Sequence, residues 1–237
     1  MVQKNKKYRI NLCLLPNVLI PEKLKIDSVK GTEATIKIRK SVFFKTQIYF
    51  VFIVILFNSC KISKPYSQEM KTELVRMYDK DQQLQDWDTK RLMDDKYIDS
   101  MEFEMDKVVR ANCETIKKYY KKYAYPGLKE NGRDTSVKFW LLVQHSDHDV
   151  VFQEEMLKAM KRELKKNNVL PRNYAYLYDR VKKNKGEKQL YGTQLGRNEA
   201  GYMVPDPELE FPGKVDELRK EMGLGKLKDY VDSFNKK

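Results

Sequence analysis

The stretch Val137–Asp149, with the sequence VKFWLLVQHSDHD, decides how the fold is read. Its first half is an apolar run that contains Phe139 and Trp140. Its second half gathers ionisable side chains, including both histidines of the protein, His145 and His148. Apolar residues that follow one another this closely on a helix are typical of an element buried on most sides. We therefore expect a buried helix with polar residues at its C-terminal end, and these residues would line a functional site.

Apolar residues recur at helical spacing on both sides of this stretch. No internal repeat and no long alternating strand is present, so we predict a single compact multi-helix domain, all-α, over residues 68–237. Ser67 is placed to cap its first helix and Pro171 to begin another. The first helix is expected to end near Asp81-Gln82 or to run on through Leu84 and Trp87. A second helix is expected over Asp95–Tyr123, with one apolar face from Ile98 to Tyr120 that includes Cys113. The other expected boundaries are a cap of the central helix at Asp134–Ser136, a helix from Val150 that ends at Asn167-Asn168, and helices over Val215–Met222 and Leu227–Phe234.

The net charge of +13 is unevenly placed along the chain. Residues 1–59 hold 11 Lys and Arg against 3 Asp and Glu, which leaves 47 − 11 = 36 basic and 34 − 3 = 31 acidic residues for the rest. There both signs are interspersed along the sequence, as on an ordinary solvated surface. A nucleic-acid-binding protein would gather basic residues on one face, and no RNA-recognition or zinc-finger motif is present. No nucleic-acid partner is therefore predicted.

The front of the chain carries a targeting pattern. Ile48–Phe57 is a run of ten apolar or aromatic residues preceded by basic residues, whereas a membrane-spanning helix needs about 20. Ten residues fit the apolar region of a secretory signal, and Asn58-Ser59-Cys60 after it resembles the looser lipoboxes of Bacteroidetes-type bacteria. We expect residues 37–60 to be a lipoprotein signal and acyl chains on Cys60 to hold the protein to a membrane. An uncleaved membrane anchor with Cys60 as a buried thiol is the alternative.

The segments on either side of this signal have simpler interpretations. Residues 1–36 place too much chain before the apolar run, so they are either a mis-called start or a disordered extension. Residues 61–67 form a short polar tether without an acidic cluster after the cysteine. That composition favours a lipid-anchored protein of the bacterial cell envelope that faces the periplasm.

Four spaced motifs, with two shorter matches in order, resemble a known family. They are Trp140–Asp147, Leu177–Val181, Gln189–Gln194 and the tail from Pro205 to Leu224, together with Asp81-Gln82 and Tyr125-Pro126-Gly127. The set is similar to the bacterial domain-of-unknown-function family DUF6624, over roughly Glu69 to Tyr230. The resemblance implies a helical domain, sometimes secreted or lipid-anchored, and it implies no particular activity. The family's recurrent polar residues correspond here to Gln144, His145, Asp147, Asp179, Arg180, Tyr191, Thr193 and Gln194.

The sequence departs from the family pattern at two places. Gln85 stands where relatives often carry an arginine, three residues after Asp81-Gln82, and His148 is outside the pattern. These departures leave the roles of His148 and of Asp81-Gln82 open.

His145 and Asp147 admit several chemical interpretations. A carboxylate can orient an imidazole that acts as general base. Residues two apart do not face each other in a continuous helix, so that pairing needs a break at Ser146. Asp147 can instead cap the following helix. His145, Asp147, His148 and Asp149 are also a possible metal-ligand set, but no second ligand group is evident, and we predict neither a metal nor a cofactor.

The sequence therefore favours a domain that binds a polar ligand or a protein partner, with the membrane as a further partner through acylated Cys60. The alternative is a hydrolase that uses His145 as general base with Asp147 or Asp179 as the orienting carboxylate, and a third interpretation is a polar network that only fixes the fold. Whether the protein is an enzyme stays open at this point. The residues expected to bind the ligand are Gln144, Asp179, Arg180, Tyr191, Thr193, Gln194, Asp81 and Gln82.

Overall fold

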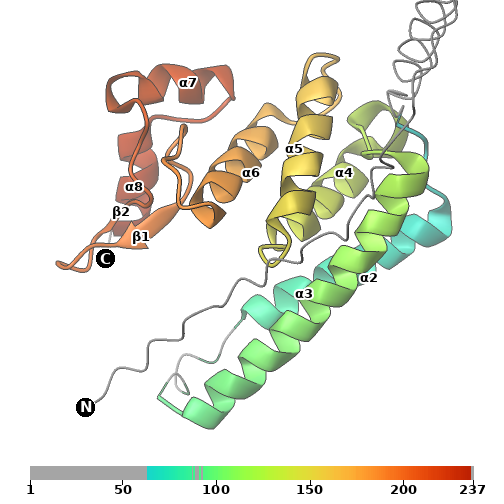
Figure 1. Ribbon diagram of the computed structural model, residues 1–237, viewed down its shortest axis with the longest axis horizontal. Coiled ribbons are helices and arrows are strands. Elements are labelled where there is room, and N and C mark those ends of the chain that lie inside the picture. Colours follow the sequence, from blue (N-terminus) through green and yellow to red (C-terminus); the bar gives the residue numbers. More distant parts are fainter. Residues whose placement is uncertain (1–62, 87, 89–90, 92, 236–237) are drawn as a thin grey trace, which may run out of the picture. The chain divides into compact units, whose positions relative to one another are not determined.

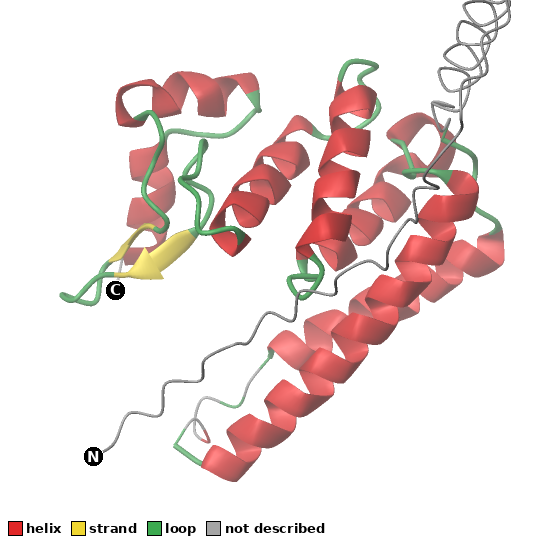
Figure 2. Ribbon diagram, in the orientation of Figure 1, coloured by secondary structure: helices red, strands yellow, loops and turns green. Residues whose placement is uncertain are grey.

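The computed structural model describes residues 63–235 with the exception of 87, 89, 90 and 92. This part of the chain is a mostly helical domain (Figures 1 and 2), which confirms the predicted fold class and adds one small antiparallel sheet. The elements are α2 Gln68–Gln85, α3 Asp95–Tyr123, α4 Leu128–Gln144, α5 Val150–Leu164, α6 Pro171–Asn184, β1 Leu195–Arg197, β2 Met203–Pro205, the 3-10 helix η2 Pro212–Lys214, α7 Val215–Glu221 and α8 Leu227–Asn235.

Several helix boundaries are those that the sequence predicts. The helix α3 has the predicted bounds, and α6 begins at Pro171. The hydroxyl of Ser67 accepts a hydrogen bond from the backbone N–H of Met70, as an N-cap does. The helix α2 ends at Gln85, so it runs on past Asp81-Gln82 and through Leu84. Trp87 lies outside the described residues.

The central helix begins earlier than predicted. The predicted cap lay at Asp134–Ser136, but α4 starts at Leu128 and is bent at Gly132, whose φ of 79° and ψ of 165° are not helical. Glycine has no Cβ and adopts positive φ without strain. One turn of helix is therefore added before the kink, and it carries Asn131 into the core.

The core is organised around α4, which packs against α2, α3, α5 and α6. Phe139 and Val143 are fully buried in it, and the Phe139 ring makes edge contacts with Tyr66 and Tyr125. Cys113 is buried on the facing side of α3, as a small core residue. Burial of a large apolar side chain such as that of Phe139 contributes roughly 1.5–3 kcal/mol to the free energy of folding. The predicted buried helix is therefore present, and its last turn fixes where the polar residues point.

The first half of α3 differs from the prediction. We expected one buried face from Ile98 to Tyr120, but among the described residues of α3 burial begins at Asn112, and Phe103 is 68% exposed. The helices α2 and α3 lie side by side as a long hairpin (Figure 1), and the first half of α3 has few neighbours other than α2. A helix that packs on a single partner covers only a narrow stripe of its surface.

The predicted tether 61–67 is corrected by the structure from Ser63 onward. Ser63 and Tyr66 are buried, the Ser63 hydroxyl accepts a hydrogen bond from the N–H of Gly127 at 3.0 Å, and the N–H of Tyr66 donates to Asn131 Oδ1 at 2.7 Å. The Asn131 amide in turn donates to the carbonyl of Lys64 at 3.1 Å. The side chain brought in by the Gly132 kink thus fastens this segment to the domain.

The C-terminal part holds the only sheet in the described residues, a pair of three-residue strands in which Gly196 lies opposite Val204. Strands this short give no alternating pattern to detect. No helix among the described residues is long and apolar enough to cross a membrane. The predicted signal, Cys60 and the segment 1–36 lie outside the residues that the structure describes.

Candidate functional site

The chain turns sharply at the polar end of α4. The helix stops at Gln144, and His145 is its C-cap residue, with φ −87° and ψ −1°. The hydroxyl of Ser146 donates to the carbonyl of Leu142 at 2.8 Å. The next helix is capped by Asp149, whose carboxylate accepts from the N–H of Phe152 at 2.9 Å, so the alternative in which Asp147 is the cap is wrong. The break at Ser146 lets His145 and Asp147 point to different neighbours.

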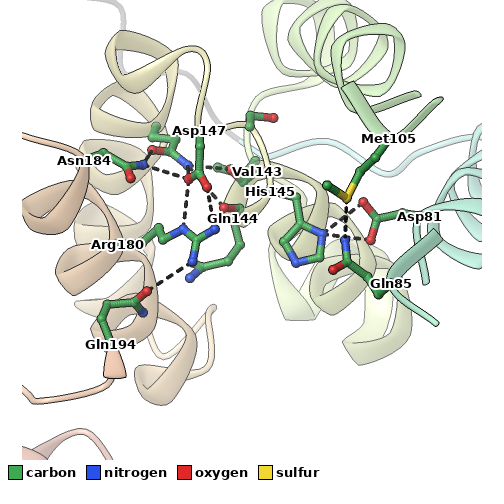
Figure 3. A network of polar contacts seen from close by, with 12 residues as sticks. Asp81, Gln85, Met105, Val143, Gln144, His145, Asp147, Arg180, Asn184 and Gln194 are labelled. Atoms are coloured by element: carbon green, nitrogen blue, oxygen red, sulfur yellow. Dashed lines mark hydrogen bonds and ion pairs between the residues drawn. The ribbon is translucent and has the colours of Figure 1, made fainter. Parts of the chain in front are cut away.

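His145 pairs with Asp81 of α2, across 64 positions of sequence. The imidazole Nδ1 lies 2.9 Å from Asp81 Oδ1 and 2.8 Å from Oδ2, and Gln82 Nε2 donates to Oδ2 at 3.0 Å. Asp81 is 1% exposed, whereas the His145 side chain is 22% exposed. Figure 3 shows the imidazole of His145 facing the carboxylate of Asp81. A carboxylate accepts hydrogen bonds, so Nδ1 carries the proton, and in the neutral ring Nε2 keeps its lone pair.

Asp147 binds Arg180 of α6 instead of His145. Arg180 Nε donates to Oδ1 at 2.9 Å and Nη2 donates to Oδ2, a bidentate pair. Oδ1 also accepts from Asn184 at 2.7 Å and from Gln153 at 3.1 Å. Burial alone would raise the pKa of Asp147, but the hydrogen bonds and charge of Arg180 outweigh it and hold the pKa below its ordinary value.

Asp179 is also committed elsewhere, to the backbone of residues 189–194. Its fully buried carboxylate accepts from the N–H groups of Leu190 at 2.8 Å, Tyr191 at 3.1 Å and Thr193 at 2.9 Å, and from the Thr193 hydroxyl at 2.9 Å. Burial raises the pKa of Asp179, and these donors oppose the rise in part. The expectation that Asp147 or Asp179 orients His145 is therefore wrong, and Asp81 is the carboxylate in contact with the imidazole.

The other side chains of the Gln189–Gln194 loop stabilise the loop through hydrogen bonds and ring contacts. The Gln189 side chain bonds both backbone groups of Gln194, at 3.0 Å to its N–H and 2.9 Å to its carbonyl. Tyr191 is buried with its ring against Tyr178. The Gln194 side chain accepts from Arg180 Nη1 at 3.2 Å. Of the loop residues predicted to bind ligand, Tyr191 and Thr193 therefore hold the loop, and Gln194 holds Arg180.

The candidate residues thus form two clusters on either side of the 145–149 turn. In Figure 3 the Asp147–Arg180–Gln194 cluster lies on one side, the His145–Asp81 pair on the other, and Gln144 between them. Gln144 is 7% exposed, and its buried Oε1 has no hydrogen-bond partner among the described residues. Buried polar atoms are nearly always paired, so this oxygen indicates a position for a bound water or a ligand donor.

Four further polar residues of the clusters were not predicted. Gln153 and Asn184 complete the shell of Asp147, and their amides meet at 2.9 Å. Neither stands out in the sequence, because the same helices bury other polar residues, Glu163 on α5 and Asn173 on α6. Gln189 stood inside a quoted motif without a role of its own. Arg219 of α7, 2% exposed, likewise stood inside the Pro205–Leu224 motif without a role of its own, and it donates to the carbonyl of Tyr191 at 2.8 Å.

The possible metal-ligand set is not brought together. Within the described residues no group of three or more His, Cys, Asp or Glu side chains is placed to hold an ion. Asp149 binds Lys117 Nζ at 2.6 Å, while Asp147 faces Arg180 and His145 faces Asp81. His148 is largely exposed. Partial desolvation of its ring and the nearby charge of Arg110 lower its pKa.

A comparison with known protein families matches residues 68–236, and the matching family is described as a family of unknown function, DUF6624. Neither a curated protein nor a solved structure matches the chain.

Proposed function

The chain belongs to the DUF6624 family, and from the arrangement of that domain's polar residues we propose that it binds a polar ligand through His145 and Gln144. The contact between His145 Nδ1 and the buried carboxylate of Asp81 carries this proposal. It fixes the ring and its tautomer and leaves Nε2 without a partner among the described residues. A rigid imidazole acceptor and the unpaired, buried oxygen of the adjacent residue Gln144 are each suited to a ligand rich in hydroxyl or amide groups.

The second cluster supports the same conclusion from the other side of the turn. Arg180 is held by Asp147 and Gln194, so its position is fixed while its side chain remains partly exposed. Its charge is neutralised by Asp147, and no excess positive charge is left to attract an anion. The proposed ligand is therefore polar and uncharged where it meets these residues.

A hydrolase is the second candidate, and the Asp81–His145 pair favours it. In that reaction His145 Nε2 takes a proton from the attacking water, and Asp81 stabilises the imidazolium that forms. General base catalysis of this kind contributes typically 10²–10⁴-fold to a rate. The corrected assignment differs from the sequence-based one only in the carboxylate.

The location that we propose is the periplasmic face of a bacterial membrane, with acyl chains on Cys60. Its support is the order of basic residues, apolar run and cysteine in the sequence. Replacement of Cys60 by Ser should release the protein from the membrane fraction. The mass of the mature N-terminal peptide should then show no acyl chains. An unmodified peptide mass in the native protein would reject the anchor.

Binding can be tested on the full chain by thermal shift against neutral oligosaccharides, muropeptides and nucleosides. A ligand at 100 times its Kd stabilises by about 2.7 kcal/mol, which is roughly 5–10 °C for a domain of this size. We expect such a shift in the native chain and in His148→Gln, but not in His145→Gln. The matched control removes the other histidine, which is exposed and has no contact with Asp81.

Two outcomes separate the candidates. Equal shifts in native protein and His145→Gln would remove His145 from the binding site. Turnover of a bound ligand that falls by about 10²–10⁴-fold in both His145→Gln and Asp81→Asn, with binding retained in Asp81→Asn, would establish the hydrolase. Glutamine at position 145 can still donate to Asp81, so loss of fold is not the expected cause.

A further inference from the structure

One end of the domain gathers segments from five helices. The start of α2, the end of α3, the start of α4, the end of α5 and the start of α6 meet there, because the helices alternate in direction. Backbone contacts join them: Lys64 N–H to the carbonyl of Tyr123 at 3.0 Å and Leu128 N–H to the carbonyl of Asn168 at 3.0 Å. We call this the basic end and define it as residues 63–69, 118–133 and 161–172.

The basic end holds more than the whole net positive charge of the domain. Its segments contain 11 Lys and Arg against 3 Asp and Glu, a net charge of 11 − 3 = +8. Residues 63–235 contain 33 basic and 31 acidic residues, so the remainder has 33 − 11 = 22 against 31 − 3 = 28, a net charge of −6. Charges that are interspersed along the sequence are therefore separated in space by the fold.

The side chains of the basic end are available for a partner. Lys64, Lys121 and Lys165 are exposed, and within the described part of the chain they form no ion pair. Two of the three acidic residues are turned inward, because Glu130 and Glu163 both accept hydrogen bonds from the amide of Asn168, at 2.9 and 2.7 Å.

The basic end is also where the chain enters the domain. Ser63 is fixed to Gly127, and only residues 61 and 62 separate it from Cys60. Three steps along the chain span at most about 11 Å, close to the Debye length of about 10 Å at 0.1 M salt. An acyl anchor on Cys60 therefore keeps Ser63, and the part of the basic end next to it, within electrostatic range of the lipid headgroups.

We propose that the basic end is a docking surface for anionic phospholipid headgroups, which holds the domain in one orientation against the membrane. This inference rests on the proposed anchor at Cys60. A polybasic surface next to a lipid chain strengthens and orients attachment, and each Lys or Arg near an anionic surface changes the binding constant about fivefold. The clusters around His145 belong to the opposite end of α4 and face away from the bilayer.

The test uses the full mature protein, acylated as isolated, in vesicles of phosphatidylcholine with or without 30% phosphatidylglycerol. An amine-reactive, membrane-impermeant reagent at low extent and mass spectrometry give the rate of each exposed lysine. We expect Lys64, Lys121 and Lys165 to react several-fold more slowly in the anionic vesicles, and 0.5 M salt to remove the difference. Lys183, an exposed lysine in the last turn of α6, is the control whose rate should not change.

Two further measurements sharpen the result. The triple variant Lys121→Gln, Lys122→Gln, Lys165→Gln should lose the protection of Lys64, whereas a variant with three exposed lysines replaced away from the basic end, at 183, 220 and 226, should keep it. Equal lysine rates in both vesicles, or protection by added RNA and none by anionic lipid, would overturn the proposal. The N-terminal peptide mass reports separately whether Cys60 is acylated, so failure of the anchor is recognised independently.

Discussion

Replacement of Asp179 by Asn tests whether the buried carboxylate is what shapes the loop before β1. The two oxygens of Asp179 share four donors: Oδ1 accepts from the N–H of Leu190, and Oδ2 accepts from the N–H and the hydroxyl of Thr193. The N–H of Tyr191 lies between them, 3.1 Å from Oδ1 and 3.2 Å from Oδ2. An asparagine amide can serve one pair of donors with its oxygen, and its NH₂ group then meets the other pair without accepting from them.

The magnitude follows from the bonds lost. A hydrogen bond to a charged group contributes about 1.5–3 kcal/mol and a neutral one about 0.5–1.5 kcal/mol. Loss of two bonds and weakening of two would cost roughly 5–9 kcal/mol, and release of a buried charge with a raised pKa returns part of this. We expect a net loss of about 2–4 kcal/mol in the free energy of unfolding.

Urea unfolding of the full chain at pH 7 measures the loss, and amide hydrogen exchange locates it. The amides of Leu190, Tyr191 and Thr193 should exchange faster, while those of α4 keep their protection relative to global unfolding. Asp99→Asn on the exposed side of α3 is the matched control and should change stability by less than about 0.5 kcal/mol. A similarly small effect of Asp179→Asn, without faster exchange in the loop, would refute the reasoning.

Three other predictions concern the core, the loop and the pH dependence. Phe139→Ala should cost about 3–5 kcal/mol in urea unfolding, because the ring is fully buried against Tyr66 and Tyr125; a loss below 1 kcal/mol would contradict the central position of α4. Gly192→Ala should lower the melting temperature, since φ is +64° and the added Cβ would lie 2.8 Å from Leu227 Cδ1; an unchanged melting temperature would show that the loop adapts. Asp147 has a lowered pKa, so it adds stability that is present above its unfolded pKa of about 3.9 and is lost as the pH falls through the lower folded value. Asp147→Asn should therefore be less stable than the native protein at pH 6 and approach it below pH 3, and a constant difference across this range would argue against the Arg180 pair as the cause.

Local signals in the sequence were sufficient for most helices. The bounds of α3 were predicted from apolar residues at helical spacing, and the first residue of α6 from proline at the first position of a helix, both of which are local signals. The prediction of the start of α4 was wrong because Asp134–Ser136 has the residue types of an N-cap, while the observed helix begins at Leu128 and bends at Gly132, where φ is positive.

The sequence indicated several polar residues that the structure brings into the two clusters, among them His145, Asp147 and Arg180, but it did not indicate their pairings. The partner of His145 was expected to be Asp147 or Asp179, because sequence proximity and shared motifs are the only guides without a fold. Asp81 reaches His145 because α2 and α4 pack side by side, a tertiary contact between residues 64 positions apart. The separation of charge into a basic end is of the same kind, since it depends on which helix ends meet.

The buried guanidinium of Arg219 gives the end of the chain a role in the middle of the molecule. It donates to the carbonyls of Tyr191 and Gly225, and its charged group lies 5.0 Å from the centre of the Tyr230 ring. Truncation before α7 would remove the clamp on one face of the loop whose other face Asp179 holds, and Gln194 would then be free to leave Arg180. A protease that trimmed the last twenty or so residues would therefore change the setting of Arg180 from a distance, without removing any residue of the two clusters.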